Sequence, residues 1–320
     1  MAQHFLLSSE ARTLSLAKVA RMTDEEAHDC FCSLRWVDTH GKPVCPDCGC
    51  CETYSITTRK QFKCKACYRQ FSVTSGTIFS NRKLPIRDYL LAIAIFVNGA
   101  KGYAALQLSR DLDCQYKSAF VMAHKIREAL GSVQAEGAAL EGDVEVDGGY
   151  FGGHIRPANL KEDRVDRRRR ENQTGKRRVV IVIRERKGRT LTFVHNHEGE
   201  GVRRVIENVV PGATIHADEA AHWDDLHVRF LTKRINHQQA YSTPESCTNM
   251  AESFFSRLRR AEVGTHHHVA GKYLEAYAAE MAWREDNRRI SNGEQFLRTT
   301  NAALAHPVSR VWAGYWQRAA

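Results

Sequence analysis

The stretch EVDGGYFGG, Glu145–Gly153, predicts a β-strand that ends in glycines, because valines and acids alternate just before them. With this period of two, the carboxylates of Asp143, Glu145 and Asp147 lie on one face of the strand. The chain as a whole has a formal net charge of +10. Acids gathered in so basic a protein indicate either a solvated edge strand or a strand whose acids face something positive.

Composition narrows the class of protein. The chain has 320 residues, 42% of them hydrophobic, which is enough for a buried core and for about two or three domains. An excess of 47 Lys+Arg over 37 Asp+Glu favours a polyanionic partner such as nucleic acid. The longest apolar run, Leu90–Val97, has eight residues, whereas a membrane span needs about 20. Since no signal-peptide pattern opens the chain, a cytoplasmic protein without a membrane partner is expected.

Two cysteine pairs predict a structural zinc site. Cys45 and Cys48 form CPDC, Cys64 and Cys67 form CKAC, and fifteen residues separate the pairs. Two short knuckles of this kind present four thiolates to one tetrahedral Zn²⁺. The alternative is a set of buried or redox-active thiols.

Hydrophobic periodicity, cysteine spacing and glycine positions divide the chain into segments. The prediction is an N-terminal helical segment (1–37), a zinc ribbon (38–80), a helical unit that resembles helix-turn-helix (81–135), an α/β domain with a mixed sheet (140–290) and a C-terminal tail (291–320). Within the α/β domain the pattern predicts a strand at Val144–Tyr150, two strands around a turn at Lys187–Gly188, a helix at Val202–Val209, a strand at Thr214–Asp218, a segment near Val228–Leu231, and helices at Thr248–Ala261 and Val269–Arg288.

Basic residues concentrate in two places that could contact DNA. The second helix of the helix-turn-helix-like unit, about Tyr116–Leu130, presents Lys117, Lys125 and Arg127, although a plain helical hairpin has the same pattern. The segment 153–178 has ten basic and four acidic residues without an apolar period. It is either a solubilising loop or a DNA-binding insertion, and relief of its self-repulsion by phosphates favours the second. Its expected DNA-binding residues are Arg167, Arg168, Arg169, Arg170, Lys176, Arg177 and Arg178.

Further carboxylates have settings that match Asp147. Asp218 ends a short β-branched strand, and Glu252 lies on a helix beside the core stripe of that helix. If the two strand ends are neighbours, the three acids converge, and divalent ions offset their repulsion. Mg²⁺, or Mn²⁺, prefers such carboxylates together with water and phosphate oxygens. Without the convergence these are ordinary surface acids.

Five motifs in order resemble one family: CPDCG, QFSVTSGTIF, EVDGGYFGG, HADEAAHWDDL and TNMAESFFSRLRRAEVGTHHH. They look like the ISXO-like bacterial insertion-sequence transposases, which belong to the DDE class and carry an N-terminal zinc ribbon. The resemblance implies an RNase H-like catalytic domain that cleaves and joins double-stranded DNA at terminal inverted repeats with Mg²⁺. It also implies a homo-oligomer that brings two ends together, and a location at the bacterial nucleoid.

The resemblance carries Asp147, Asp218 and Glu252 over as the catalytic triad. Arg259 matches the position of a DNA-holding cation, and Arg260 follows it. Some family members have asparagine as the third metal-site residue, and Asn249 stands one turn before Glu252. Glu252 is preferred because a carboxylate binds Mg²⁺ more strongly than an amide does, and Asn249 is an accessory residue.

Two other functions compete with transposition. A zinc-ribbon transcription regulator would bind DNA without needing the three acids, and a nuclease or resolvase would cut without joining. In the transposase interpretation, Asp143 and Glu145 are expected to be solvated or paired with basic side chains.

Overall fold

The computed structural model describes residues 5–152, 158–166, 172, 175–235 and 247–318. The chain forms two compact units, one of residues Met1–Val133 with Asn287–Ala320 and one of residues Gln134–Asp286. The C-terminal segment, which the sequence predicts to be a separate tail, is therefore part of the N-terminal unit. In the described part of the chain, no helix combines the length and the apolar character that crossing a membrane requires.

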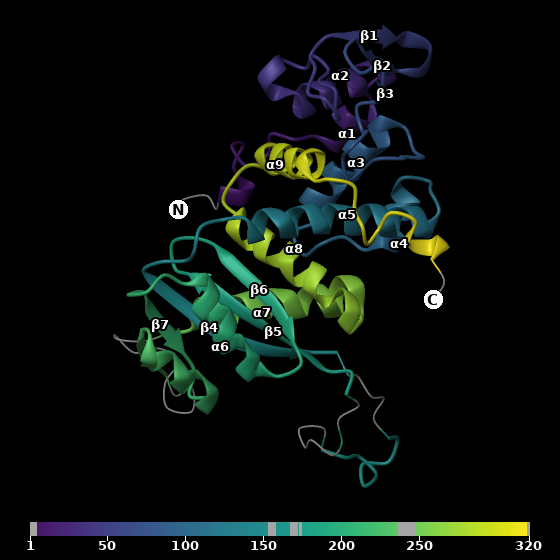
Figure 1. The fold of residues 1–320 in the computed structure, drawn as a ribbon. Helices are drawn as coiled ribbons and strands as arrows, with labels where there is room; N and C mark the ends of the chain where they lie inside the picture. Colours follow the sequence, from purple (N-terminus) through teal and green to yellow (C-terminus); the bar gives the residue numbers. More distant parts are fainter. Residues whose placement is uncertain (1–4, 153–157, 167–171, 173–174, 236–246, 319–320) are drawn as a thin grey trace. The chain divides into compact units, whose positions relative to one another are not determined.

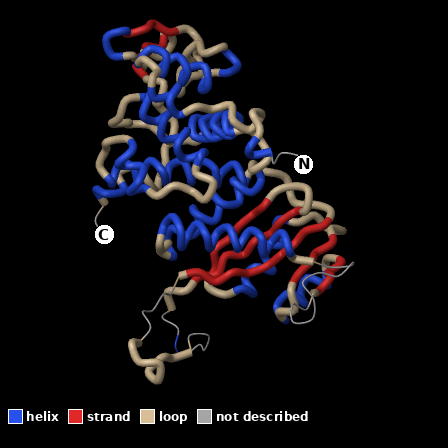
Figure 2. The backbone as a smooth tube through the Cα atoms, turned by 180° about the vertical axis from the view of Figure 1, so that it is seen from behind, coloured by secondary structure: helices blue, strands red, loops and turns tan. Residues whose placement is uncertain are grey.

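The second unit is built on a mixed five-stranded sheet, drawn as red strands in Figure 2. Three neighbouring strands on one side of the sheet form antiparallel pairs, and the two strands on the other side run parallel to the strand at the centre. This is the RNase H-like arrangement, as predicted. In spatial order the strands are β6 (Thr190–His195), β5 (Arg178–Glu185), β4 (Asp143–Phe151), β7 (Thr214–Ala217) and β8 (Leu231–Arg234).

Helices cover both faces of this sheet, as the run RVVIVIRE of β5 requires, because its side chains are buried on both sides. On one face Ile181 and Ile183 share a core with Val205 of α6 (Gly201–Asn208). On the other face Val180 and Val182 pack with α7 (Asn249–Ala261) and α8 (Leu274–Asp286). Figure 1 shows these three helices around the sheet.

Two boundaries in this unit differ from the sequence prediction. The segment predicted near Val228–Leu231 is the end of a 3-10 helix, η6 (Ala221–Val228), followed by β8. The long helix predicted from Val269 is shorter, because Gly271 lies in a separate 3-10 turn, η8 (Gly271–Tyr273), ahead of α8. Glycine has low helix propensity, so the regular helix begins after it. The remaining short turns of the unit are η5 (Glu198–Glu200) and a π-helical turn, η7 (Glu262–His266).

The first unit begins with short helices and the ribbon. A capping box starts α2: Thr23 Oγ1 accepts from the Glu26 amide at 3.1 Å, and the Glu26 carboxylate accepts from the Thr23 amide at 2.8 Å. In chain order the elements are η1 (Phe5–Leu7), α1 (Leu16–Ala20), α2 (Asp24–Arg35), η2 (Val37–Thr39), β1 (Thr53–Ile56), η3 (Thr57–Arg59), β2 (Gln61–Cys64) and β3 (Gln70–Phe71). The three strands form an antiparallel sheet.

Helices complete the first unit. They are α3 (Ile86–Asn98), α4 (Ala105–Asp111), α5 (Tyr116–Ala135), α9 (Asn292–Ala305) and a 3-10 turn, η9 (Tyr315–Gln317). A tight turn with Asp113 at φ 47° separates α4 from α5, which is the pair of helices predicted to resemble helix-turn-helix. Helix α9 contacts α2 and α3, so the last segment of the chain takes part in this core.

Candidate active site

The register of the sheet places Asp147 and Asp218 side by side. In the parallel pair of β4 and β7, Val146 is opposite Ala217, so each aspartate is the next residue along its strand. The parallel pairing of β4 with β7 ends at this pair, so both aspartates directly follow it, although β4 itself continues to Phe151 beside β5. The Ala220 amide donates to Asp218 Oδ1 at 3.1 Å, and Arg234 of β8 donates to the backbone carbonyl of Asp218, which fixes the turn after β7.

Glu145 ties helix α7 to strand β4. Its side chain is 1% exposed, and its Oε2 accepts from the amides of Met250 at 2.8 Å and Ala251 at 3.1 Å. These amides belong to the first turn of α7, which lacks partners within the helix. Arg186 pairs with the other oxygen of Glu145 at 2.9 Å. The expectation that Glu145 is paired with a basic side chain is therefore confirmed, whereas the alternative that it is solvated is wrong.

The pleat of β4 explains where the other acids of this strand lie. Asp143, at the start of the strand, is half-exposed, and its Oδ1 is 2.9 Å from Nε2 of the buried His216. Gly149 lies under Phe255 of α7, so closely that a Cβ at Gly149 would be 2.5 Å from the Phe255 ring. Helix α7 therefore covers the acid-bearing face at Gly149, and β4 is the central strand of the sheet, so the alternative of a solvated edge strand is wrong.

These two anchors hold the first turn of α7 against β4. Between Met250, held by Glu145, and Phe255, packed on Gly149, the first turn of α7 carries Glu252. Burial is the main cause that raises the pKa of Asp147; the charge of Glu252 also raises this pKa, and the charge of Arg259 lowers it. Arg259 is exposed, with its guanidinium 5.4 Å from the centre of the Phe151 ring. Asn249 is the first residue of α7 and is exposed, as is Arg260.

Glu198 joins this group, and sequence reasoning missed it. One carboxylate oxygen from each of Asp147, Asp218 and Glu198 lies within 4.8 Å of the others. Glu198 is in η5, after β6, and it reaches over Gly148: a Cβ at Gly148 would be 2.1 Å from Glu198 Oε1. Gly148, directly after Asp147, has no side chain, and this is the local feature of the sequence that could have indicated the approach of another group.

The carboxylates of Asp147, Asp218 and Glu198 are partly buried and repel one another. Burial raises the pKa of Asp147 to about 7, and the charges of Asp218 and Glu252 contribute in the same direction. Burial also raises the pKa of Glu198 to about 7, with Asp218 and Asp147 as further causes. His222 Nε2 is 3.8 Å from Glu198 Oε1. Oxygen ligands in such a cluster fit a hard divalent cation, which would offset the repulsion.

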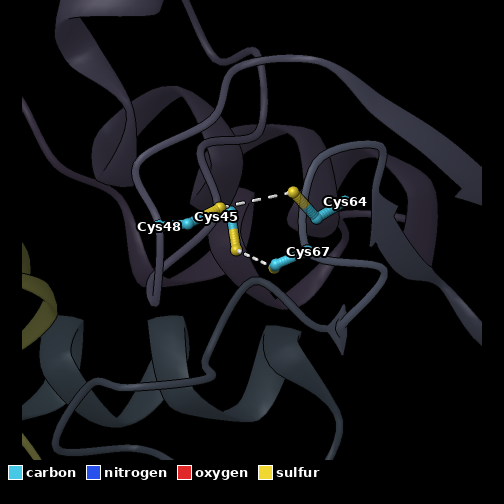
Figure 3. Close-up of side chains that lie close together, drawn as sticks. All are labelled: Cys45, Cys48, Cys64 and Cys67. Carbon is cyan, nitrogen blue, oxygen red and sulfur yellow. Dashed lines mark hydrogen bonds between the residues drawn. The ribbon is translucent and has the colours of Figure 1, made fainter.

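The four predicted zinc ligands converge in the ribbon (Figure 3). Cys45 Sγ is 3.6 Å from Cys67 Sγ, Cys48 Sγ is 3.5 Å from Cys64 Sγ, and all four sulfurs lie within 4.8 Å of one another. With Zn–S bonds of about 2.3 Å, sulfurs at the corners of a tetrahedron are about 3.8 Å apart. The arrangement fits a structural zinc ion.

The cations predicted to bind DNA have different positions. Lys117 is exposed on α5 and Lys125 is half-buried. Arg127 is 1% exposed, with its guanidinium 5.6 Å from the centre of the Phe96 ring, so the prediction that it contacts DNA does not hold. Its helix turns that position towards α3 instead of solvent.

Only part of the basic insertion lies in the described chain. Arg177 lies over the Tyr150 ring at 4.4 Å, and Arg178 begins β5. Lys176 precedes them and is exposed. The predicted residues Arg167, Arg168, Arg169 and Arg170 lie outside the described residues.

Two parts of the chain match known domain families. Residues 139–286 match the model of the ISXO2-like transposase domain, and residues 22–70 match that of a transposase zinc-ribbon domain. A protein of Halobacterium salinarum, described as "Uncharacterized protein in transposable element ISH50", is 24% identical over 129 residues, which are 40% of this chain and 42% of that protein. No solved structure matches.

Proposed function

This chain belongs to the ISXO2-like transposases, and we propose that it binds the terminal inverted repeats of an insertion sequence and catalyses cleavage and transfer of DNA strands there. The observation that carries the proposal is the convergence of Asp147, Asp218 and Glu198, one carboxylate oxygen of each lying within 4.8 Å of the others. The DNA substrate would place the protein at the nucleoid.

In this proposal the carboxylates hold Mg²⁺, or Mn²⁺, by their oxygens. A bound divalent ion lowers the pKa of a coordinated water and offsets charge on the leaving oxygen. Asp147 on β4 and Asp218 directly after β7 would hold their oxygens on a rigid sheet, and Glu252 would complete the triad from α7. Glu198 adds a fourth carboxylate, and Arg259 is placed to contact a DNA phosphate. The nucleophiles would be water and a DNA hydroxyl.

The remaining parts of the protein would serve DNA binding. Zn²⁺ held by the four cysteines would stabilise the ribbon, in which Trp36, Phe62 and Phe71 form a small buried aromatic cluster. Basic residues of α5, the insertion and α7 would contact phosphates. Two element ends must be brought together for transposition, so a dimer or larger homo-oligomer is part of the proposal.

One assay separates this function from the two alternatives. The purified protein is incubated with Mg²⁺ or Mn²⁺ and a labelled duplex that carries the ends of its own element. Nicked and joined products support a transposase, whereas nicking without joining indicates a nuclease or resolvase. Binding without cleavage at any metal concentration would support a regulator.

The third member of the triad can be tested by a pair of variants. Glu252→Gln is expected to lower the cleavage rate by about 10³-fold, because it removes a charged metal ligand beside Asp147. Asn249→Ala is expected to change the rate by less than about tenfold, since Asn249 is exposed at the first residue of α7. Single-turnover cleavage rates check both. The reverse order of effects would make Asn249 the third residue.

The raised pKa values predict a pH dependence of stability that metal removes. In the metal-free fold Asp147 and Glu198 keep a proton up to about pH 7, whereas in the unfolded chain they lose it near their ordinary pKa values of 3.8 and 4.5. The unfolded state therefore binds fewer protons between about pH 4 and pH 7, and the stability contributed by these groups falls as the pH rises through that window. We expect Mg²⁺ to raise Tm more at pH 8 than at pH 5.5, where it must displace protons.

Thermal unfolding of the full chain with and without Mg²⁺ at the two pH values checks this expectation. The variant Asp147→Asn is the control. It removes the carboxyl group whose pKa is raised most, so it should reduce the difference between the Mg²⁺ effects on Tm at the two pH values. An equal Mg²⁺ effect on Tm at both pH values would contradict the cluster as the metal site.

A further inference from the structure

A groove in the first unit lies apart in the chain from the residues of the candidate active site. It has a cavity volume of about 400 Å³, within the range of roughly 300–1,000 Å³ that small-molecule sites occupy. Three segments line it: the loop 80–84 before α3, one face of α5 and the segment 312–317 around η9. All three belong to the same compact unit.

The described lining of the groove is basic. Arg82, Lys83, Lys117 and Lys125 line it, and no aspartate or glutamate does so among the described residues. Burial lowers the pKa of Lys125, although Glu128 raises it. A half-buried lysine in such surroundings favours an anionic occupant, because an anion offsets the loss of solvation of the ammonium group.

The same groove presents aromatic rings held in fixed positions. Trp312 is buried and stacks on His124 with ring centres 4.2 Å apart, which anchors the segment to α5. Trp316 is 45% exposed, and its indole Nε1 donates to the Lys117 carbonyl at 3.3 Å. Tyr315 lies 5.2 Å from Trp316 between ring centres. Fixed, partly exposed rings beside cations are the combination that binds unpaired nucleotides, the rings taking the bases and the cations the phosphates.

The position of the cations on α5 separates two ways of binding DNA. A recognition helix that reads a duplex enters the major groove with its own side chains foremost. Here Lys117 and Lys125 face a cavity that the loop 80–84 and the segment 312–317 also line. A cavity of this volume accommodates about one nucleotide, not a double helix.

We propose that this groove binds an unpaired nucleotide of a DNA strand, with its base against Trp316 and its phosphates against Lys117 and Lys125. The inference rests on the proposed function, because it requires that DNA is the substrate. It adds a site for single-stranded DNA in the first unit, outside the catalytic domain. Unpaired nucleotides arise where the ends of an element are opened or cut.

The test uses the full-length protein without added Mg²⁺ and two fluorescein-labelled probes, a mixed-sequence single strand and a blunt hairpin duplex of the same sequence. Fluorescence anisotropy gives Kd for each probe. Trp316→Ala is expected to weaken single-strand binding about 5- to 150-fold, as loss of one base stack does, and to change duplex binding less than twofold. Trp316→Phe, which keeps a ring, should retain most of the affinity.

Lysine variants test the phosphate contacts without touching the aromatic cluster. Lys117→Gln and Lys125→Gln should each reduce the slope of log K against log salt for the single strand by about 0.7. The matched control is Lys18→Gln, an exposed lysine of the same unit on α1, outside the groove lining, which should leave the slope unchanged.

Two results would overturn the proposal. One is single-strand binding by Trp316→Ala and by the double lysine variant that equals that of the unaltered protein. The other is an equal loss for single strand and duplex, which would make the groove a general phosphate-binding surface. Asp147→Asn should bind the single strand normally, so failure of the catalytic proposal would appear in cleavage and not in this assay.

Discussion

Replacing Asp147 or Asp218 by asparagine is expected to abolish DNA cleavage and, at the same time, to raise the Tm of the metal-free protein. The loss of cleavage should be at least about 10³-fold, because each variant removes a charged ligand from a site where the metal stabilises the transition state by several kcal/mol. The two effects have opposite signs because the carboxylates serve metal binding at the cost of mutual repulsion.

The gain in stability follows from the distances in the cluster. Carboxylate oxygens of Asp147, Asp218 and Glu198 lie within 4.8 Å of one another. Two unit charges about 4 Å apart repel by about 4 kcal/mol at an effective dielectric constant of about 20. Protonation relieves part of this repulsion, since the pKa of Asp147 is raised to about 7, so the stability gain should be largest above that pH.

Cleavage rates with Mg²⁺ and Tm values without it, both at pH 8, check this prediction. Glu219→Gln is the matched control, because Glu219 is the exposed neighbour of Asp218 and lies outside the cluster. It should leave both quantities close to those of the unaltered protein. Variants of Asp147 and Asp218 that cleave normally, or that lower Tm as ordinary core substitutions do, would remove the basis of the proposed site.

Removing zinc is the second prediction with a large effect. Cys45→Ser or Cys64→Ser is expected to unfold the ribbon, because both cysteines are buried and structural zinc contributes an apparent 10–16 kcal/mol, roughly, in small zinc domains. The ribbon has little core to compensate: Trp36 meets Phe62 and Phe71 at ring distances of 5.7 and 6.4 Å. Loss of this cluster should red-shift the tryptophan fluorescence.

Metal analysis and fluorescence check the prediction together. The unaltered protein should contain about one zinc per chain, and a chelator should reproduce the effect of Cys45→Ser. Cys51→Ser is the control, because Cys51 is an exposed cysteine near the cluster but not in it. A full zinc content in Cys45→Ser, or an unchanged spectrum after zinc removal, would show that the ribbon does not depend on the ion.

Sequence patterns predicted the fold well where the signal is local. The strands of the sheet, the capping box of α2 and the cysteine knuckles all depend on residues close together in the chain. Asp147 and Asp218 could be matched because each follows a short run with valine or β-branched residues, and the parallel register then places them side by side, although β4 continues past Asp147 to Phe151. The two aspartates are therefore close together because β4 and β7 are paired in parallel.

The rest of the site depends on contacts that no local pattern contains. Glu198 follows β6, two strands from β4 in the sheet, and comes near Asp147 only because Gly148 leaves room. Glu145 has the same alternation as Asp147, yet it caps α7 more than a hundred residues later in the chain. Arg127 follows the same helical pattern as Lys125, and only the packing of α5 on α3 shows that it is buried.

The most direct test of the central claim is to locate the metal. Crystals of the protein grown with Mn²⁺ should give an anomalous scattering peak within coordination distance of Asp147 and Asp218, with Glu198 and Glu252 next to it. The same crystals of Asp147→Asn should have a weaker peak or none. Mn²⁺ bound elsewhere on the second unit, with the cluster empty at saturating concentration, would contradict the account.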